Sequence, residues 1–378
     1  FQRRRYWRST TAETVSSAAA WPPGERVVTP AAEAQFRLPI GLAGFPWLGD
    51  HRVHGRAVVP GAFQIACLAG AWRATRGNGP VSIADLTFAH PLVVSEEGAV
   101  EVWTSLAPDG TARLLSRDDD GWTPHADARL GAAGDVPVAM DLEEVRQRCR
   151  SEIAPDEWRE RLAGIGITVG PAFAGIRHLW RGDAEALAEV RLPDGLMAPA
   201  DGPHPALLDA CLQVAGGTLA DDMAGEPLLP VGIDRVALFG PVAGPLWVHA
   251  CGSGRGEVIS TDVTVCTEDG TVVATVEGLH VRRAPAGLLR DGAASALFHA
   301  VEWREADPPR AAAGGRVVVV AADPAHGETL AAALGDRADV VADPADLPEL
   351  HDSDTVVDLT AWNEAGDVAR SLALARRI

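Results

Sequence analysis

The strongest constraint on the fold is a pattern that occurs twice along the chain: several short strand-like runs accompany one apolar helix-like run. In the first occurrence, an alternating run at Val81–Phe88 follows an apolar helix predicted at Gly61–Ala74. In the second, a run at Val272–Arg282 follows an apolar helix predicted at Pro205–Leu219. The two stretches show no detectable sequence repeat, so only the pattern recurs. It predicts a pseudo-duplicated α+β unit.

The other predicted elements fill in these two units and the segments around them. Further strands are predicted at Val100–Leu106, Ala112–Ser116, His178–Trp180, Ala184–Arg191, Arg235–Leu238, Leu246–Gly252 and Ile259–Cys266. Between the units, Gly131–Gly134 is typical of a loop and Asp141–Ser151 of a charged helix. After about Ala284, a strand at Val317–Val320, a helix at His326–Leu334 and strands at Ala338–Val341 and Thr355–Thr360 indicate a partial α/β, βαβ-like segment. No GxGxxG follows its first strand, so phosphate binding there is not supported.

These changes in the sequence pattern divide the chain into five parts. Residues 1–24 are a linker that is rich in Ser, Thr, Ala and Pro after its first few residues. The two repeated units are expected at 25–135 and 151–285, joined by a linker at 136–150. Residues 286–378 hold the partial α/β segment. Because the chain starts at Phe1 and not at Met, we expect it to be a piece of a longer protein.

Composition narrows the classes of function. The 378 residues are enough for two or three domains, and 47% of them are hydrophobic. A net charge of −19 argues against nucleic acid and anionic lipid as partners, since both need compensating Lys and Arg. No apolar run is long enough to span a membrane. The five cysteines are scattered without a CxxC, which predicts neither disulfides nor a zinc-binding spacing and favours a reducing cytoplasm.

His51 is the first candidate for chemistry. It lies about ten residues before an apolar helix that begins near Pro60-Gly61. The free N–H groups at that helix end would polarise a carbonyl oxygen, and Gly61 allows a ligand to come close. On its own, His51 is equally an ordinary loop histidine. A metal site made of His51 and His54 is disfavoured because no third ligand lies nearby in the sequence.

Asp209 is the second candidate, because it is an ionisable residue in the middle of an apolar helix. Gln213 lies four residues later, on the same helix face. Burial would raise the carboxyl pKa, so Asp209 would stay protonated and act as an acid. The alternative is a solvent-facing Asp on an amphipathic helix. A base and an acid with separated pKa values suit an elimination, but also several other reactions.

Four ordered segments of the sequence resemble the motifs of one family. The segments are His51-x-x-x-Gly55-x-x-x-x-Pro60, Gly166-Ile167-Thr168-Val169-Gly170-Pro171-Ala172-Phe173, His204-Pro205-x-x-x-Asp209-x-x-x-Gln213 and Leu229-Pro230-Val231. They are similar to the histidine motif, the GYxYGPxF motif, the aspartate motif and the LPF motif of dehydratase domains from type I modular polyketide synthases. The resemblance covers residues 25–285. The flanks resemble a post-acyltransferase linker and the start of a ketoreductase structural subdomain with a Rossmann-like fold.

The resemblance implies a double hotdog fold, with two antiparallel sheets that each wrap around a central helix. It implies elimination of water from a β-hydroxyacyl thioester, with His51 as base and Asp209 as acid. The substrate would be carried on the phosphopantetheine arm of an acyl carrier protein, with its thioester carbonyl facing the N–H of Gly61. Substrate contacts would come from Gln213, Gly61, Pro60, Val169, Gly170, Pro171 and Phe173. No metal or bound cofactor is implied. Neighbouring acyltransferase and ketoreductase domains and a homodimer are the implied partners.

The sequence departs from the family pattern in the second motif. The two tyrosine positions hold Ile167 and Val169, and Tyr6 is the only tyrosine in the chain. The change predicts either a neutral difference in channel shape or a changed outcome. One such outcome is a bifunctional dehydratase-cyclase that adds a distal hydroxyl to the new double bond. Two further alternatives are thioester hydrolysis, for which no GxSxG nucleophile motif is present, and a non-catalytic scaffold.

Overall fold

The computed structural model describes residues 21–117, 121–199, 202–219, 225–253, 258–284, 317–320, 328, 338–341 and 355–358. Contacts divide the chain into two compact units, Phe1–Ala300 and Val301–Ile378. Most of the predicted linker at 1–24 therefore lies outside the described residues. Among the described residues, no helix combines the length and the apolar character needed to cross a bilayer.

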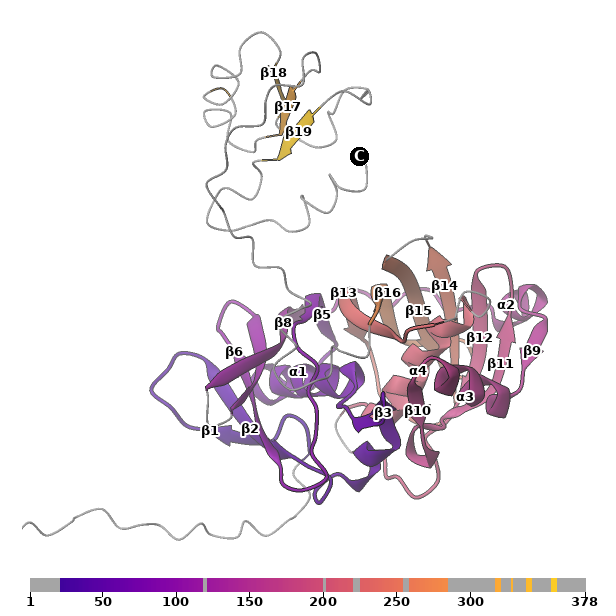
Figure 1. Ribbon diagram of the computed structural model, residues 1–378, viewed down its shortest axis with the longest axis horizontal. Coiled ribbons are helices and arrows are strands. Elements are labelled where there is room, and N and C mark those ends of the chain that lie inside the picture. The colour runs from indigo at the N-terminus through magenta and orange to yellow at the C-terminus, as the bar shows by residue number, and fades with distance from the viewer. Residues whose placement is uncertain are drawn as a thin grey trace, which may run out of the picture. The chain divides into compact units, whose positions relative to one another are not determined.

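The first unit is built on one antiparallel sheet of 13 strands (Figure 1). Their order across the sheet is β1-β2-β6-β7-β8-β5-β13-β16-β15-β14-β12-β11-β9. The strands are β1 (Glu25–Val27), β2 (Ala34–Ile40), β5 (Val81–Phe88), β6 (Val100–Leu106), β7 (Thr111–Arg117), β8 (Trp122–Ala132), β9 (Ser151–Ile153), β11 (Ile176–Arg181), β12 (Glu185–Val190), β13 (Leu228–Leu238), β14 (Leu246–Ser253), β15 (Val258–Cys266) and β16 (Val272–Arg283). The alternating runs in the sequence thus form strands, as predicted.

Two buried helices lie inside this sheet, α1 (Gly61–Arg76) and α4 (Pro205–Gly217). Both are apolar around most of their circumference, and such helices are stable only when they are enclosed. Helix α1 packs on β2, β5, β6, β7 and β8, while α4 packs on β11, β12, β14 and β15. The two helices also pack against each other, and a single hydrophobic core runs through both halves. The predicted pattern of one helix per half is confirmed.

The predicted division into two separate sheets is wrong, because β5 of the first half pairs with β13 of the second. The register places Leu86 opposite Ile233 and Ile83 opposite Val236. Two separate sheets would each leave an edge strand with unpaired backbone groups. Pairing β5 with β13 satisfies these groups and makes the hydrogen bonding continuous across the halves.

A second, small sheet also joins the halves and carries the first candidate residue. Its order is β10 (Ile167–Val169), β3 (His51–Val53) and β4 (Arg56–Ala57). Short 3-10 helices flank it, η1 (Pro46–Asp50) and η2 (Pro171–Phe173). His51 is therefore in a strand and not in a loop, and that strand pairs with a strand of the other half.

The connection between the halves differs from the prediction. Helix α2 (Leu142–Arg148) is shorter than predicted, since Ser151 already belongs to strand β9. Helix α3 (Pro155–Gly164) was not predicted. Its signals were present in the sequence: a proline in the first turn, followed by two acidic residues, and two buried apolar residues at i and i+4, Trp158 and Leu162.

In the second unit, the structure describes a parallel sheet in the order β18-β17-β19. The strands are β17 (Val317–Val320), β18 (Ala338–Val341) and β19 (Thr355–Asp358), which matches the predicted strand positions. Except for Glu328, the predicted helix His326–Leu334 lies outside the described residues.

The seam between β5 and β13 yields a prediction on stability. Leu86 is 1% exposed and lies opposite Ile233, which is 2% exposed. We expect Leu86→Ala to lower the free energy of unfolding by about 2–5 kcal/mol, because it leaves a cavity in a close-packed core. Chemical denaturation measures the change. The control is Arg235→Ala on the partner strand β13, where an exposed side chain should change stability by less than about 0.5 kcal/mol. A cost for Leu86→Ala no larger than that of the control would contradict the role of the seam.

Candidate functional site

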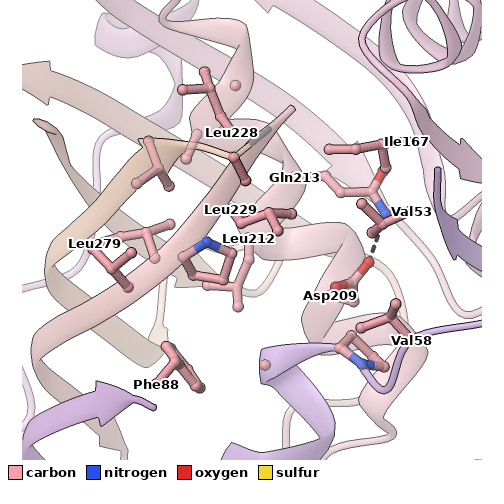
Figure 2. A pocket seen from close by; sticks show the side chains of 18 of the residues that line it. Val53, Val58, Phe88, Ile167, Asp209, Leu212, Gln213, Leu228, Leu229 and Leu279 are labelled. Atoms are coloured by element: carbon pink, nitrogen blue, oxygen red, sulfur yellow. Dashed lines mark hydrogen bonds between the residues drawn. The ribbon is translucent and has the colours of Figure 1, made fainter. Parts of the chain in front are cut away.

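A cavity of about 220 Å³ lies where residues of the two halves meet (Figure 2). Its walls come from β3, α1, β10, α4, β13 and β16, and most of them are apolar, including Leu212, Leu229 and Leu279. The polar side chains on the wall are His51, Gln64, His90, Asp209, Gln213, Thr261, Arg282 and Arg283. An apolar pocket with a few convergent polar groups is the usual form of a small-molecule site.

His51 is held in one orientation by its own half of the molecule. The ring nitrogen Nδ1 lies 2.8 Å from the carbonyl oxygen of Val58. Because a carbonyl only accepts, Nδ1 carries the proton and donates it, which leaves the lone pair on Nε2. The Phe173 ring lies 5.2 Å from the imidazole, centroid to centroid. In its neutral form, His51 thus has its lone pair on Nε2, the nitrogen that would act as a general base.

Asp209 lies in the second turn of α4 and is 8% exposed. Burial raises the pKa of its carboxyl, and the nearby His51 and a hydrogen bond from Gln213 offset that rise only in part. Gln213 Nε2 donates to Asp209 Oδ2 at 2.7 Å (Figure 2). The same amide lies 3.5 Å from the carbonyl oxygen of Phe173. With Oδ2 accepting from Gln213, a proton on Oδ1 is free to be donated.

The amino-terminal end of α1 forms another part of the wall. Pro60 caps the helix and Gly61 is its first residue. The backbone N–H groups of a first turn have no partner within the helix, so they are available to an oxygen atom in the cavity. A Cβ atom at Gly61 would lie 3.0 Å from Phe88 Cζ, so a larger residue here would crowd the wall.

Of the four residues in the segment 166–173 that were predicted as substrate contacts, only Val169 lines the cavity. Val169 lies opposite His51 in the β10–β3 pair and lines the cavity. Gly170, Pro171 and Phe173 do not appear on the wall that the described residues form. Their predicted role as substrate contacts is therefore not supported by their position. The chain turns away from the cavity after Val169, into the 3-10 helix η2.

Asp50 explains what these residues do instead. Its backbone oxygen accepts the N–H of Gly170 at 2.7 Å, and its side-chain Oδ2 accepts the N–H of Ala172 at 2.8 Å. A Cβ atom at Gly170 would lie 2.6 Å from Asp50 Cγ, so only glycine leaves room for this carboxylate. The segment is thus fixed to the residue that precedes His51.

Sequence reasoning missed several residues of the site. Asp50 gave no signal beyond its place next to His51. Trp158 and Leu162 line the cavity from α3, a helix that was not predicted. His204 is part of the aspartate motif, and its ring nitrogen Nδ1 accepts the N–H of Ala206 at the start of α4. Burial lowers the pKa of His204 to about 4, so it stays neutral and acts as a helix cap.

The contact between Gly170 and Asp50 yields a prediction. We expect Gly170→Ala to lower the free energy of unfolding by about 1–3 kcal/mol, because the added methyl group overlaps the Asp50 carboxylate. Thermal and chemical denaturation measure it. Gly164→Ala is the matched control: a Cβ there meets no atom within 4 Å, and alanine in a helix is more stable than glycine by up to about 1 kcal/mol. Equal stability of the two variants would show that the contact is unimportant.

The buried carboxyl of Asp209 yields a prediction on pH. Its pKa in the folded state lies above the usual 3.8 of an exposed aspartate, so the folded state binds this proton more tightly than the unfolded chain does. The resulting stabilisation is complete below pH 3.8 and is lost as pH rises through the higher, folded-state pKa. Asn has no such proton. We therefore expect Asp209→Asn to gain stability over the wild type as pH rises from 4 to 8, measured by denaturation. A constant difference across this range would contradict a raised pKa.

Two family models match the chain. One, described as "Polyketide synthase dehydratase domain", matches residues 24–116, and the other, "Polyketide synthase dehydratase N-terminal domain", matches residues 137–291. Among curated proteins, polyketide synthase ThaG of Burkholderia thailandensis is 31% identical over 85% of the chain. Polyketide synthase GfsA of Streptomyces halstedii is 32% identical over 85% of the chain. The chain spans only 6% and 4% of these two relatives.

Solved structures of dehydratase domains also resemble this chain. The dehydratase domain from the CurJ module of curacin polyketide synthase is 28% identical, with a TM-score of 0.65 over 70% of this chain and 98% of that one. The dehydratase domain of a mycocerosic acid synthase-like polyketide synthase is also 28% identical, with a TM-score of 0.65 over 71% and 99%. The antiparallel sheet and its two buried helices are thus a hotdog fold of this kind. The chain therefore contains a dehydratase domain of the polyketide synthase family, which makes it a hydro-lyase.

Proposed function

We propose that His51 and Asp209 together eliminate water from a β-hydroxyacyl thioester and leave an α,β-unsaturated thioester. One observation carries the proposal: a histidine with a free Nε2 and a carboxyl group with a raised pKa line the same apolar cavity. A proton acceptor and a proton donor that face one cavity are typical of proton-transfer enzymes.

The proposed step moves two protons and breaks two bonds. His51 Nε2 removes the proton on the carbon next to the thioester carbonyl. Asp209 donates its proton to the β-hydroxyl, and the C–O bond breaks as water leaves. The N–H groups at the start of α1, including that of Gly61, stabilise the negative charge that develops on the carbonyl oxygen. The imidazolium and the carboxylate that result return to their starting forms by proton transfer.

The cavity wall supports this chemistry over a covalent mechanism. Among the described residues, the wall contains no serine or cysteine, so hydrolysis through an acyl-enzyme has no nucleophile of these types there. One solved relative also bears on the histidine: an inactive variant of the CurJ dehydratase, 27% identical to this chain, has a histidine replaced by phenylalanine. By analogy, we assign the essential histidine of this chain to His51.

The substrate and the partners follow by analogy with the same family. We propose a substrate carried on the phosphopantetheine of an acyl carrier protein, with no cofactor bound by the domain itself. We also propose acyltransferase and ketoreductase domains in the same polypeptide, a homodimer and a cytoplasmic location. Residues 1–24 would then be the linker after an acyltransferase, and 286–378 the start of a Rossmann-like ketoreductase subdomain.

A second outcome, cyclisation after dehydration, is favoured by one observation. Val169 stands opposite His51 on the cavity wall, at a position where the family motif has tyrosine. A valine there leaves space beside the base that a phenol would fill. A distal hydroxyl of the substrate chain would enter this space and add to the new double bond, with His51 taking the hydroxyl proton and Asp209 donating a proton to the carbon next to the carbonyl.

Activity of two variants tests the acid–base pair. We expect His51→Gln and Asp209→Asn each to lower kcat by about 10²–10⁴-fold, because each removes a proton-transfer group. The assay follows loss of water from a carrier-bound β-hydroxyacyl thioester by mass spectrometry. The control is His54→Asn, which removes a neighbouring imidazole. Asparagine tolerates the positive φ of 48° at this position. Activity retained by either variant of the pair would sink the proposal.

The same assay separates the two outcomes. A β-hydroxyacyl substrate with a second, distal hydroxyl gives either an open-chain alkene or an oxygen heterocycle, which have equal mass and different chromatographic retention. Only the heterocycle supports cyclisation. The open-chain alkene as sole product restricts the domain to dehydration.

A further inference from the structure

A second group of reactive side chains lies outside the cavity, on neighbouring strands β12 and β14. Glu185 of β12 pairs directly with Cys251 of β14. His249 lies two residues before Cys251, and so on the same face of the sheet. One ligand atom from each residue lies within 4.8 Å of the other two. None of the three lines the cavity that holds His51 and Asp209.

The distances between these atoms suit one small cation. His249 Nε2 lies 3.0 Å from Glu185 Oε2 and 3.4 Å from Cys251 Sγ. In a tetrahedral zinc site, metal bonds of about 2.0–2.3 Å put nitrogen and oxygen ligands about 3.3 Å apart and nitrogen and sulfur ligands about 3.5 Å apart. The two distances from His249 Nε2 thus lie within a few tenths of an ångström of those in a zinc site.

We propose that Glu185, His249 and Cys251 form a binding site for one zinc-class divalent cation. Imidazole nitrogen, thiolate sulfur and carboxylate oxygen are the ligand types that zinc takes in proteins. All three residues are partly buried, with side-chain exposures of 12% for His249 and 23% for Glu185. Partial burial favours binding, because fewer waters compete, and leaves a path for the ion to enter.

Arg148 is a charged neighbour of this group, as is Asp262 opposite Cys251, and the contacts of Arg148 are compatible with a metal. Its Nε donates to both oxygens of Glu185, at 3.1 and 3.0 Å. A carboxylate oxygen has two lone pairs, so Oε2 can accept from Arg148 and also bind a metal. A hydrogen bond of this kind orients a metal-binding carboxylate. The positive charge of Arg148 opposes the cation, and the negative charges of Glu185 and of the Cys251 thiolate offset it.

Binding would change the protons at the site. An ordinary cysteine thiol carries its proton at neutral pH. A metal binds the thiolate, so the cation replaces this proton, which passes to solvent. His249 Nε2 now faces Glu185, and binding turns this nitrogen into a metal ligand with the ring proton on Nδ1. We therefore expect the release of about one proton per cation at neutral pH.

The test uses the whole 378-residue chain after treatment with a chelator and a reducing agent. Zinc is titrated by calorimetry in two buffers that differ in ionisation enthalpy, and cobalt by absorption spectroscopy. We expect one ion per chain, release of about one proton per ion and, with cobalt, a sulfur-to-metal charge-transfer band. Cys251→Ser should abolish that band, and Cys251→Ser and His249→Gln should each weaken zinc binding by at least about tenfold.

Two control variants make the result decisive. His178→Gln removes the other histidine on this part of the sheet that faces a glutamate, Glu152, at 3.5 Å. It should leave zinc binding unchanged, because no thiol completes that pair in the described structure. His51→Gln, in the cavity, should also leave it unchanged. Absence of binding, binding that survives Cys251→Ser, or binding that His51→Gln removes would each overturn the site. The result is independent of the dehydration assay.

Discussion

The pairing of β3 with β10 positions His51 relative to Asp209, because it fixes the strand that carries His51 to a segment of the half that carries Asp209. A chain of contacts continues from there. Asp50 holds the backbone of Gly170 and Ala172, and the carbonyl of Phe173 lies next to the Gln213 amide, which donates to Asp209. The base and the acid thus belong to one connected framework. Proton transfer depends on such positioning, since a displacement of about 1 Å costs about 100-fold in rate.

Burial of Asp209 is the second requirement of this site. A carboxylate in an apolar helix is unfavourable, and the group responds by keeping its proton. The same apolar walls that raise its pKa surround the carboxyl group, so the folded state is less stable at pH values where this group is ionised. Gln213 limits this effect, because its hydrogen bond favours the ionised form in part, and it fixes which oxygen carries the proton.

Local patterns predicted much of the fold and drew attention to His51 and Asp209, and long-range pairing explains what these patterns missed. Alternating runs and apolar helices mark most strands and both buried helices, because burial alone dictates these patterns. Neither pattern shows which strand pairs with which, so the β5–β13 seam and the resulting single sheet were not predicted. For the same reason, Gly170 and Pro171 were placed at the substrate. Only the structure shows that Gly170 makes room for Asp50, a residue 120 positions earlier.

The three residues of the proposed cation site show the same limit, since the sequence does not reveal which strands pair. Ligand spacing such as CxxC can be recognised because the ligands lie on one short segment. Glu185 lies more than 60 residues before His249, and only the β12–β14 register brings them to one place. Strand pairing therefore has two roles in this molecule. Between the halves, it brings His51 and Asp209 into one proposed proton-transfer site. Within the second half, it brings a carboxylate, an imidazole and a thiol together as ligands of the proposed cation.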